Sequence, residues 1–395
     1  SRISLHLIGT ENIGVDDANI FFVYAKNLAE GHGFVYNAGG ERVEGYSSML
    51  WTLILAGVFS ITSKPEPVIL FLNLIFGAVT LTALTSFFRD WMERRTGNST
   101  QPLLGFGGLF LLAWALTSPG FVVWTMITLM ENGLWTMVAV LGTLSMLEHA
   151  RSEVQPMRDR AKFALLLSLV ILSRPEGMLW AAVLGVGAFI ARWVQGGGFV
   201  RSFGEVALPA GACVLTVAGL FVFRMTYFGY PFPNTYYAKV SPDKVYNLVE
   251  GSKYLARFQL SNWLVPVFTL IALLGGWKLV RCVLQRFRPT ALGSRKVSTS
   301  DLSVGLLSLV LLVGGIIPVL VGGDHFVLFR FYQVIWPVLP LPVLMLAGPT
   351  LSERINLPTN WRVMLPILTT ALLIFFPRDA WYRLNPQHSI RSEFN

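Results

Sequence analysis

Hydrophobic residues in this chain occur in long uninterrupted runs rather than in stripes on an otherwise polar helix. A helix that crosses the hydrocarbon of a bilayer needs about 20 mostly apolar residues, and fewer where the bilayer thins. Ten stretches qualify: 67–88, 103–118, 132–147, 161–173, 178–191, 206–223, 263–277, 302–321, 331–348 and 363–376. The pattern therefore predicts an all-α, polytopic transmembrane helical bundle over residues 67–376, within a single membrane domain that covers 1–395.

The composition agrees with a membrane protein and excludes other classes. Of the 395 residues, 53% are hydrophobic and 13% are charged, whereas an ordinary soluble domain has about 25% charged residues. A soluble globular fold is excluded, and so are disordered, collagen-like and coiled-coil chains, which need compositions or repeats that are absent here. Only Cys213 and Cys282 are present, too few for a disulfide framework or a metal cluster.

The positions of Lys and Arg predict the orientation in the membrane. The stretch 48–61 is too short to span and is expected to lie on the membrane surface as a helix. Five connecting loops on one side then hold 17 of the 31 basic residues, which marks that side as cytoplasmic. In a polytopic membrane protein, basic residues first of all reflect the orientation of the loops. The net charge of +9 is therefore no sign of a nucleic-acid partner, and none is expected.

The same orientation places both ends of the sequence outside the cytoplasm. Residues 1–66 form the first external loop, and 377–395 form a short external tail. Because a chain with this orientation should begin in the cytoplasm, and because no initiator Met or signal peptide is seen, we expect one further span before residue 1. The expected total is eleven.

The predicted spans carry no charge near their centres, so chemistry is expected at the water boundary. This argues against an ion-coupled transporter, whose coupling groups lie near the midplane. Five unusual polar sequences fall on the predicted external side: VDDANIFFVYAKNLAEGHGFVYNAGGERVEGYSSMLW (15–51), LMEN (129–132), SRPEG (173–177), YFGYPFPNTYYAK (227–239) and GGDHFVLFR (322–330). We expect them to assemble one external site.

Asp16 and Asp17 are the candidate catalytic residues. One of two adjacent carboxylates can act as a general base while the other holds a loop, a metal or a substrate hydroxyl. Asp16 is the first choice for the base. The alternative is an N-cap for the helix expected over residues 20–28, with Asp17 the better candidate for that role.

Four cations on the same side could surround an anionic group: Arg174, Lys239, His325 and Arg330. Arg suits a phosphate because its planar fork bonds two oxygens. The alternatives are that Arg174 pairs with Glu176 or Glu131 to pin helix ends, that Lys239 and Arg330 reach toward lipid headgroups, and that His325 bonds Asp324.

Acceptor and aromatic side chains complete the candidate site as sugar- or acceptor-binding residues. They are Glu44, Tyr46, Glu131, Glu176, Asn234, Tyr236, Tyr237 and Asp324. No HExxH, P-loop, GxSxG or paired cysteines occur, which excludes zinc proteases, NTPases and serine hydrolases. No metal ligands are predicted and no cofactor is required, although the external carboxylates are compatible with a divalent cation.

The DDANIFFVYAKNLAEGHGFVYNAGGERVEGYSSMLW run, followed by SRPEG, FGYPFPNTYYAK and GGDHFVLFR, resembles bacterial integral-membrane glycosyltransferases of the GT-C type. Within that group it is most similar to the branch that includes the mycobacterial arabinofuranosyltransferases. The resemblance implies transfer of a sugar, for example a pentofuranose such as arabinofuranose, from a polyprenyl-phosphate donor. It also implies a site on the periplasmic side of the bacterial inner membrane, inversion at the anomeric carbon, and a base from the DD pair.

The expected function is therefore an inverting transfer to a periplasmic glycan, glycolipid or protein. Nucleotide sugars are confined to the cytoplasm, and no nucleotide-binding motif occurs, so an external transfer requires a lipid-linked donor. Two alternatives remain from the sequence. One is a flippase for lipid-linked saccharides, which would need polar residues along the bundle interior. The other is an enzyme that moves a phospho-group between lipids, with a metal and a nucleophilic Thr or Ser.

Overall fold

The computed structural model describes residues 16–96, 101–152, 155–239, 241–287 and 297–354, except that the side chains of Asp16, Lys239 and some residues at segment ends lie outside the description. Within these ranges the chain is helical and has no strand. The helices are α2 (Asp16–Ala29), α3 (Met49–Phe59), α4 (Glu66–Thr96), α5 (Gln101–Leu116), α6 (Pro119–Val122), α7 (Asn132–His149), α8 (Met157–Ser173), α9 (Gly177–Val194), α10 (Phe199–Tyr227), α11 (Asn234–Lys239), α12 (Lys244–Ser261), α13 (Leu264–Phe287), α14 (Thr299–Leu320) and α15 (Leu341–Arg354). A π-helix, η2 (Val123–Ile127), follows α6, and two 3₁₀ segments, η3 (Val327–Tyr332) and η4 (Trp336–Val338), precede α15.

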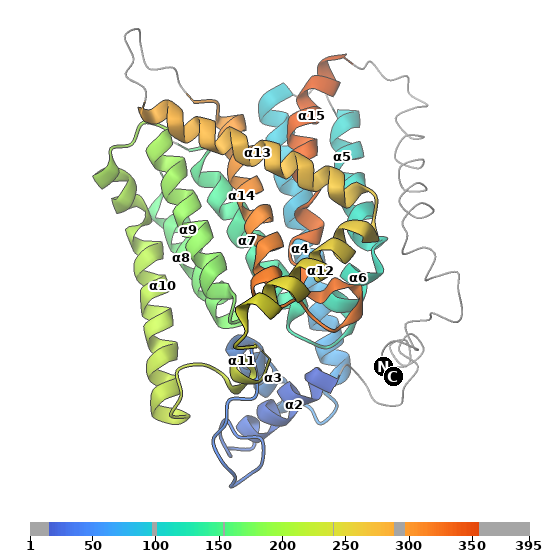
Figure 1. The fold of residues 1–395 in the computed structure, drawn as a ribbon, viewed down its shortest axis with the longest axis vertical. Helices are drawn as coiled ribbons and strands as arrows, with labels where there is room; N and C mark the ends of the chain where they lie inside the picture. The colour runs from blue at the N-terminus through green and yellow to red at the C-terminus, as the bar shows by residue number, and fades with distance from the viewer. Residues whose placement is uncertain (1–15, 97–100, 153–154, 240, 288–296, 355–395) are drawn as a thin grey trace.

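The long helices run side by side along the long axis of the molecule, and α2, α3 and α11 lie together at one end of them (Figure 1). We call this the α2 end of the bundle. Helix α13 crosses the bundle obliquely, and α12 lies between it and the α2 end (Figure 1). The prediction of an all-α membrane bundle is confirmed.

Five helices are long and apolar enough to cross a membrane: α4, α9, α10, α13 and α14. A sixth span results if Phe106–Leu116 and Pro119–Ile127, which are bent by 73° at the break between them, count as one. These six correspond to the predicted stretches 67–88, 178–191, 206–223, 263–277, 302–321 and 103–118. The protein is thus a multi-pass membrane protein.

The predicted number of ten spans is too high for the described residues. The stretches 132–147 and 161–173 form α7 and α8, which are helical but are not among the helices that meet the length and composition of a span. Helix α7 packs against α4, α8 and α9, and most of its residues are buried, so it contacts protein rather than lipid. The stretch 363–376, the segment 1–15 and the tail 377–395 lie outside the described residues.

The predicted span 331–348 is not one helix but η3, η4 and α15 with breaks between them. Pro337 and Pro340 lie at the breaks, because proline has no amide hydrogen to donate to the preceding turn. Pro342 lies in the first turn of α15, where proline is tolerated. Non-helical backbone at this depth needs partners within the protein. Trp114 supplies one: its indole donates to the carbonyl of Trp336 at 2.7 Å, the Trp336 indole donates to Trp114 O at 3.2 Å, and the two rings stack with centroids 4.4 Å apart.

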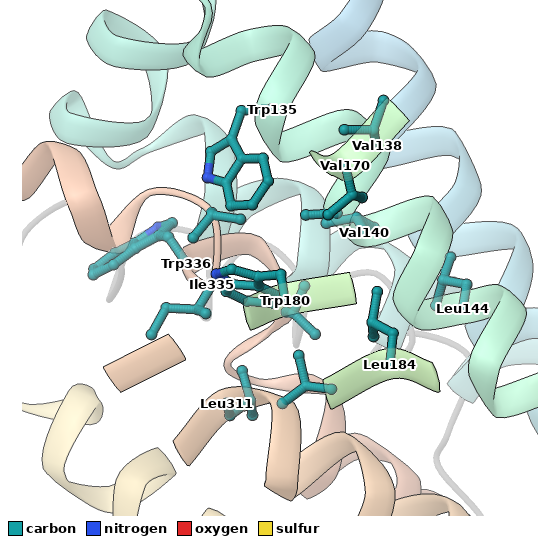
Figure 2. Close-up of a cluster of buried hydrophobic side chains, with 14 of the residues drawn as sticks. Trp135, Val138, Val140, Leu144, Val170, Trp180, Leu184, Leu311, Ile335 and Trp336 are labelled. Carbon is teal, nitrogen blue, oxygen red and sulfur yellow. The ribbon is translucent and has the colours of Figure 1, made fainter. Parts of the chain in front are cut away.

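The centre of the bundle is a core of aliphatic and tryptophan side chains from α7, α8, α9, α14 and the broken segment (Figure 2). Trp135 and Trp180 meet edge to face with centroids 5.7 Å apart. Since this core contains no charge, buried charges are confined to the ends of the helices that surround it. Both candidate chemistry and structural ion pairs must lie there.

The stretch 48–61, expected to be a short helix on the membrane surface, contains the helix α3. The Ser48 side chain accepts the amide of Trp51 at 3.1 Å and thereby caps its first turn. Helix α3 packs chiefly against α2 and also touches α8 and α4. It therefore supports α2, the helix that carries the two adjacent acids.

Candidate functional site

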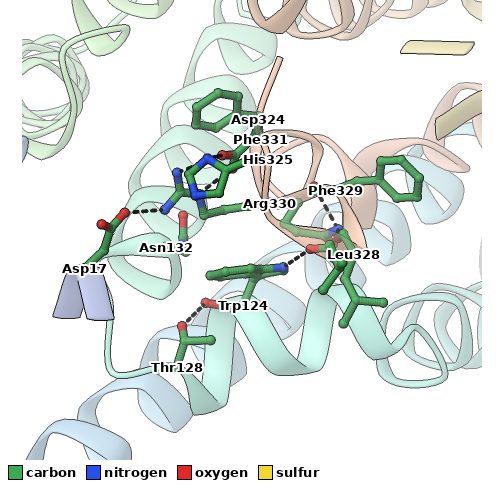
Figure 3. A network of polar contacts seen from close by, with 12 residues as sticks. Asp17, Trp124, Thr128, Asn132, Asp324, His325, Leu328, Phe329, Arg330 and Phe331 are labelled. Atoms are coloured by element: carbon green, nitrogen blue, oxygen red, sulfur yellow. Dashed lines mark hydrogen bonds and ion pairs between the residues drawn. The ribbon is translucent and has the colours of Figure 1, made fainter. Parts of the chain in front are cut away.

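Four of the five polar sequences meet at the α2 end of the bundle (Figure 3). Asp17 comes from α2, Asn132 from the LMEN sequence, and Asp324, His325 and Arg330 from the GGDHFVLFR sequence. SRPEG joins them through Arg174, whose guanidinium donates to Asn132. The structure thus brings these four sequences together.

Arg330 is the centre of the first ion network. It donates through Nε to Asp324 Oδ2 at 2.7 Å and through Nη2 to Asp324 Oδ1 at 3.2 Å, a bidentate pair. Its Nη1 donates to Asp17 Oδ2 at 3.2 Å, across 313 positions of sequence. The side chains of Arg330 and Asp324 are buried, whereas Asp17 retains 21% of its side-chain exposure. Asp17 is therefore the acid of this network that solvent reaches.

The expected cap role of Asp17 is not what the structure shows. Helix α2 begins at Asp16, so Asp17 lies inside the first turn and its carboxylate binds Arg330 instead. A negative charge in the first turn is favourable beside the helix dipole. The side chain of Asp16 is outside the description.

His325 lies beside this network with its ring exposed. Its Nδ1 is 3.5 Å from Asp324 Oδ1, and its side chain is 74% exposed. Aromatic rings surround the guanidinium of Arg330: Phe326 at 4.4 Å, Phe331 at 5.3 Å and Trp124 at 5.5 Å from its carbon to the ring centroid. Phe326 also packs against the ring of His325, with centroids 4.2 Å apart. An imidazole in this position can meet a ligand that approaches from solvent.

Arg174 is the centre of a second network, in which both expected carboxylate partners are present. It donates to Glu131 Oε1 at 2.6 Å, to Glu176 Oε1 at 2.6 Å and to Asn132 Oδ1 at 3.2 Å. Although burial lowers the pKa of Arg174, Glu176 and Glu131 outweigh that effect and raise the pKa above its ordinary value. Arg174 is a fixed buried cation that joins the LMEN and SRPEG sequences.

The two networks are neighbours. The Arg174 guanidinium lies 5.4 Å from the ring of Phe331, the same ring that Arg330 approaches, and Asp324 is close enough to Arg174 to raise its pKa. Together they hold four carboxylates, from Asp17, Glu131, Glu176 and Asp324, around two guanidinium groups. Because the carboxylates outnumber the guanidinium groups, an anion can bind strongly only if a further cation joins the site or a guanidinium gives up one of its carboxylate partners.

Local sequence explains how Arg174 is presented. Pro175 ends α8, so Arg174 adopts an extended backbone (φ −158°, ψ 154°) at the helix end. The Gly177 amide then donates to Arg174 O at 2.9 Å, which closes the turn into α9. A Cβ on Gly177 would collide with the carbonyl of Val170, so the glycine of SRPEG is required for this close approach of α9 to α8.

Glu44 and Tyr46 are not in either network. Both oxygens of Glu44 accept from Arg224 of α10, at 2.8 Å and 3.0 Å, and the pair is buried. Tyr46 is fully buried, and burial raises the pKa of its hydroxyl. These residues attach the first external loop to α10, which is a structural role rather than the expected sugar contact.

Asn234, Tyr236 and Tyr237 lie on α11 with exposed side chains. The Asn234 amide donates to Glu44 O at 2.9 Å, so α11 is tied to the same loop as the Glu44–Arg224 pair. The rings of Tyr236 and Tyr237 contact each other and Phe232. The side chain of Lys239 lies outside the description.

Several residues of the site were not singled out from the sequence. Arg224 was noted only as a charge at a span end, and nothing marked its pairing with Glu44. Trp124, Phe331 and Gln333 read as ordinary apolar or connecting positions, because their contacts depend on a backbone that folds back on itself. Among the described residues, no group of three or more His, Cys, Asp and Glu is arranged to hold a metal ion.

Comparisons with known proteins give a distant likeness of fold. No family model matches the sequence, and no curated protein matches it. The structure is similar to that of the oligosaccharyltransferase of Archaeoglobus fulgidus in the apo form, with a TM-score of 0.48 and 13% identity over 95% of this chain and 54% of the other. It is also similar to the archaeal oligosaccharyltransferase AglB of the same organism in complex with an inhibitory peptide and a dolichol-phosphate, with a TM-score of 0.45 and 12% identity over 95% and 53%. The chain spans about half the length of these structures, and the likeness is too distant to assign a family or an activity.

Proposed function

We propose that the protein is a membrane glycosyltransferase that moves a sugar from a polyprenyl-phosphate donor to a hydroxyl acceptor at the α2 end of the bundle. One observation carries the proposal: the partly exposed carboxylate of Asp17 and the guanidinium of Arg330, 313 positions apart, meet at 3.2 Å where apolar helices end. A lipid-linked donor presents its phosphate at that level, because its tail remains among the apolar chains.

The chemistry requires a base and a cation close together. The acceptor oxygen forms a bond to the anomeric carbon while the bond from that carbon to the phosphate oxygen breaks. The hydroxyl proton goes to the base, and the bonding electrons leave with the lipid phosphate. Positioned bases contribute about 10²–10⁴-fold to such steps, and preorganised cations stabilise the charge that develops on the leaving group.

We assign the base to Asp17 and the phosphate contacts to Arg330 and His325. Asp17 holds one nitrogen of Arg330, whereas Asp324 holds two others. A phosphate that takes the Nη1 position releases Asp17 toward the acceptor, while Asp324 keeps the guanidinium in place. Donor binding thus prepares the base, and the exposed imidazole of His325 adds a second contact.

The donor sugar we favour is a pentofuranose such as arabinofuranose, and the compartment is the periplasmic side of a bacterial inner membrane. Both rest on the resemblance of the DD, SRPEG, FGYPFPNTYYAK and GGDHFVLFR sequences to GT-C glycosyltransferases. The acceptor would be a glycan, a glycolipid or a protein. The exposed rings of Tyr236 and Tyr237 are suited to stack on its sugars.

A flippase for lipid-linked saccharides is the second candidate, and the positions of buried charges disfavour it. The buried charged residues of the described ranges, among them Glu131, Arg174, Arg192, Arg224 and Arg330, lie at or beyond helix ends. A path through the bundle for the anionic phosphate of a lipid-linked saccharide would need charged groups along its length.

Mass spectrometry of products from the purified protein tests the proposal. The protein in nanodiscs receives a panel of polyprenyl-phosphate pentoses and hexoses with saccharide acceptors. A new glycosidic product from one donor supports transfer and names the sugar. If no donor yields a product, and the protein in proteoliposomes instead moves the intact donor between leaflets, the flippase replaces the transferase.

A further inference from the structure

The segment that carries Asp324 and Arg330 has a strained backbone. Leu328 (φ 61°, ψ 22°) and Phe329 (φ 54°, ψ 54°) lie in the left-handed region one after the other, and side chains with a Cβ rarely adopt it. Such strain persists only where surrounding structure enforces it, and it concentrates at functional sites. We therefore asked which side chains enforce it.

Gln333 holds the strained residues through its side chain. Its Nε2 donates to Leu328 O at 2.7 Å and to Phe329 O at 3.1 Å. Gln333 is buried, and among the described residues its Oε1 has no hydrogen-bond partner. An unpaired buried acceptor is unfavourable, so this amide is oriented for the two carbonyls at a cost to stability.

Trp124 holds the same segment at Val327, the residue before Leu328. Its indole Nε1 donates to Val327 O at 3.0 Å, and its ring lies 5.5 Å from the guanidinium of Arg330 (Figure 3). The π-helix η2 carries this residue, and such helices occur often at functional sites. Trp124 thus fixes the backbone and one side of the cation together.

The fit around these contacts is close. A Cβ on Gly120 would lie 2.7 Å from both the Gln333 side-chain nitrogen and Leu328 O. On the other side, Tyr254 of α12 stacks on Tyr332, with centroids 5.2 Å apart. A side chain at position 120 would therefore displace the Gln333 amide or Leu328 O.

We propose that Gln333 and Trp124 are positioning residues, which hold the strained segment so that Arg330 presents one guanidinium nitrogen to the phosphate of a lipid-linked donor. Neither residue touches the reacting atoms. The identity of the ligand rests on the proposed function, but the positioning of Arg330 does not. The test therefore measures the segment and the ligand separately.

The first variant is Gln333→Met, which keeps the length of the side chain and removes both hydrogen bonds. Its matched control is Gln155→Met, because Gln155 is also buried and its Nε2 also donates to a backbone carbonyl, Glu148 O at 3.0 Å, at the opposite end of the bundle. Hydrogen exchange in nanodiscs should become about tenfold faster in a peptide over 327–332 for Gln333→Met alone. Equal exchange in this peptide for Gln333→Met and wild type would overturn the proposal.

The second measurement is the affinity for a polyprenyl monophosphate without a sugar. We expect about tenfold weaker binding for Gln333→Met, because the charge-assisted contact between Arg330 and the phosphate is lost. Binding to Gln155→Met should be unchanged. Unchanged affinity in Gln333→Met while wild type binds would overturn the link to the ligand. If wild type itself does not bind, the proposed function fails, and the exchange experiment alone decides whether Gln333 positions the segment.

Trp124→Phe provides an independent variant in case Gln333→Met does not fold. It keeps a ring beside Arg330 and removes the indole donor. Trp51→Phe is its control, because the indole nitrogen of Trp51 is buried without a hydrogen-bond partner among the described residues. Hydrogen exchange over 327–332 that is faster in Trp124→Phe but not in Trp51→Phe supports the proposal. Equal exchange rates in the two variants would contradict it.

Discussion

Buried arginine–carboxylate pairs lie at both ends of the bundle, and they are built differently. At one end, Arg192 in the last turn of α9 binds Glu205 near the start of α10, with 2.5 Å between Nε and Oε2. The two residues are 13 positions apart, on consecutive helices. At the α2 end, Arg330 binds Asp324, six positions earlier, and Asp17, which is 313 positions away in the sequence.

The surroundings of Arg192 and Arg330 also differ, in backbone strain and in access to solvent. Arg192 also donates to the carbonyl of Ser152, just after α7, and both members of the ion pair, Arg192 and Glu205, lie on regular helices. Arg330 lies on strained backbone, beside an exposed imidazole and an acid that solvent reaches. A pair that only joins helices needs neither strain nor access, so the comparison separates a structural pair from a candidate site.

The largest expected effect is on transfer in Asp17→Asn. If Asp17 is the base, the rate should fall by about 10³-fold. The apparent Tm should change little, because a pair with a partly exposed acid contributes only about 0–1 kcal/mol. Product mass spectrometry and thermal unfolding of the same preparation measure both.

Glu250→Gln is the control for that variant, since Glu250 pairs with Lys253 at 2.7 Å on the surface of α12. Asp16→Asn distinguishes the two adjacent acids. Loss of activity in Asp16→Asn with full activity in Asp17→Asn would move the base to Asp16.

For Glu205→Gln we expect the stability to fall and the activity to be kept, the reverse of Asp17→Asn. This change leaves Arg192 buried beside a neutral side chain, which should lower the free energy of unfolding by about 3 kcal/mol. Activity per folded molecule should not change. A lower rate per folded molecule at unchanged Tm would show that the two ends are not as different as we infer.

Arg174→Met should weaken donor binding by about tenfold if Arg174 helps to neutralise the phosphate. Because the single variant also leaves Glu131 buried and unpaired, the comparison needs Arg174→Met combined with Glu131→Gln. Recovery of both Tm and donor affinity in the double variant would leave Arg174 with the helix-pinning role alone.

The smallest effect is expected from His325→Gln. An exposed cation contributes about 0.2–1 kcal/mol, so donor affinity should fall by no more than about fivefold, with no change in Tm. His32→Gln is the matched control, because His32 is also exposed and lies near an acid, Glu30. Equal affinities in the two variants would remove His325 from the phosphate site.

The sequence predicted the class of fold well, because the class depends on local composition. Long apolar runs predict membrane helices whatever their neighbours are, and polar sequences between them must lie at the boundary. The same reasoning failed for 331–348, where the composition resembles a span but Pro337 and Pro340 lie where the helix is broken. It also gave too large a number of spans among the described residues, because α7 and α8 are helical but do not reach the length and hydropathy of a span.

Which residues share a contact was decided by the tertiary structure. Glu44 and Glu131 are both acids in predicted external loops, yet one binds Arg224 and the other binds Arg174. Asp17 follows Asp16 directly, and only the packing of α2 places it on Arg330. Helix ends are set by nearby residues, whereas an ion pair across 313 positions depends on how all the intervening helices pack. For that reason the sequence alone determined a membrane bundle with acidic and basic residues near the helix ends, and only the fold selected the partners among them.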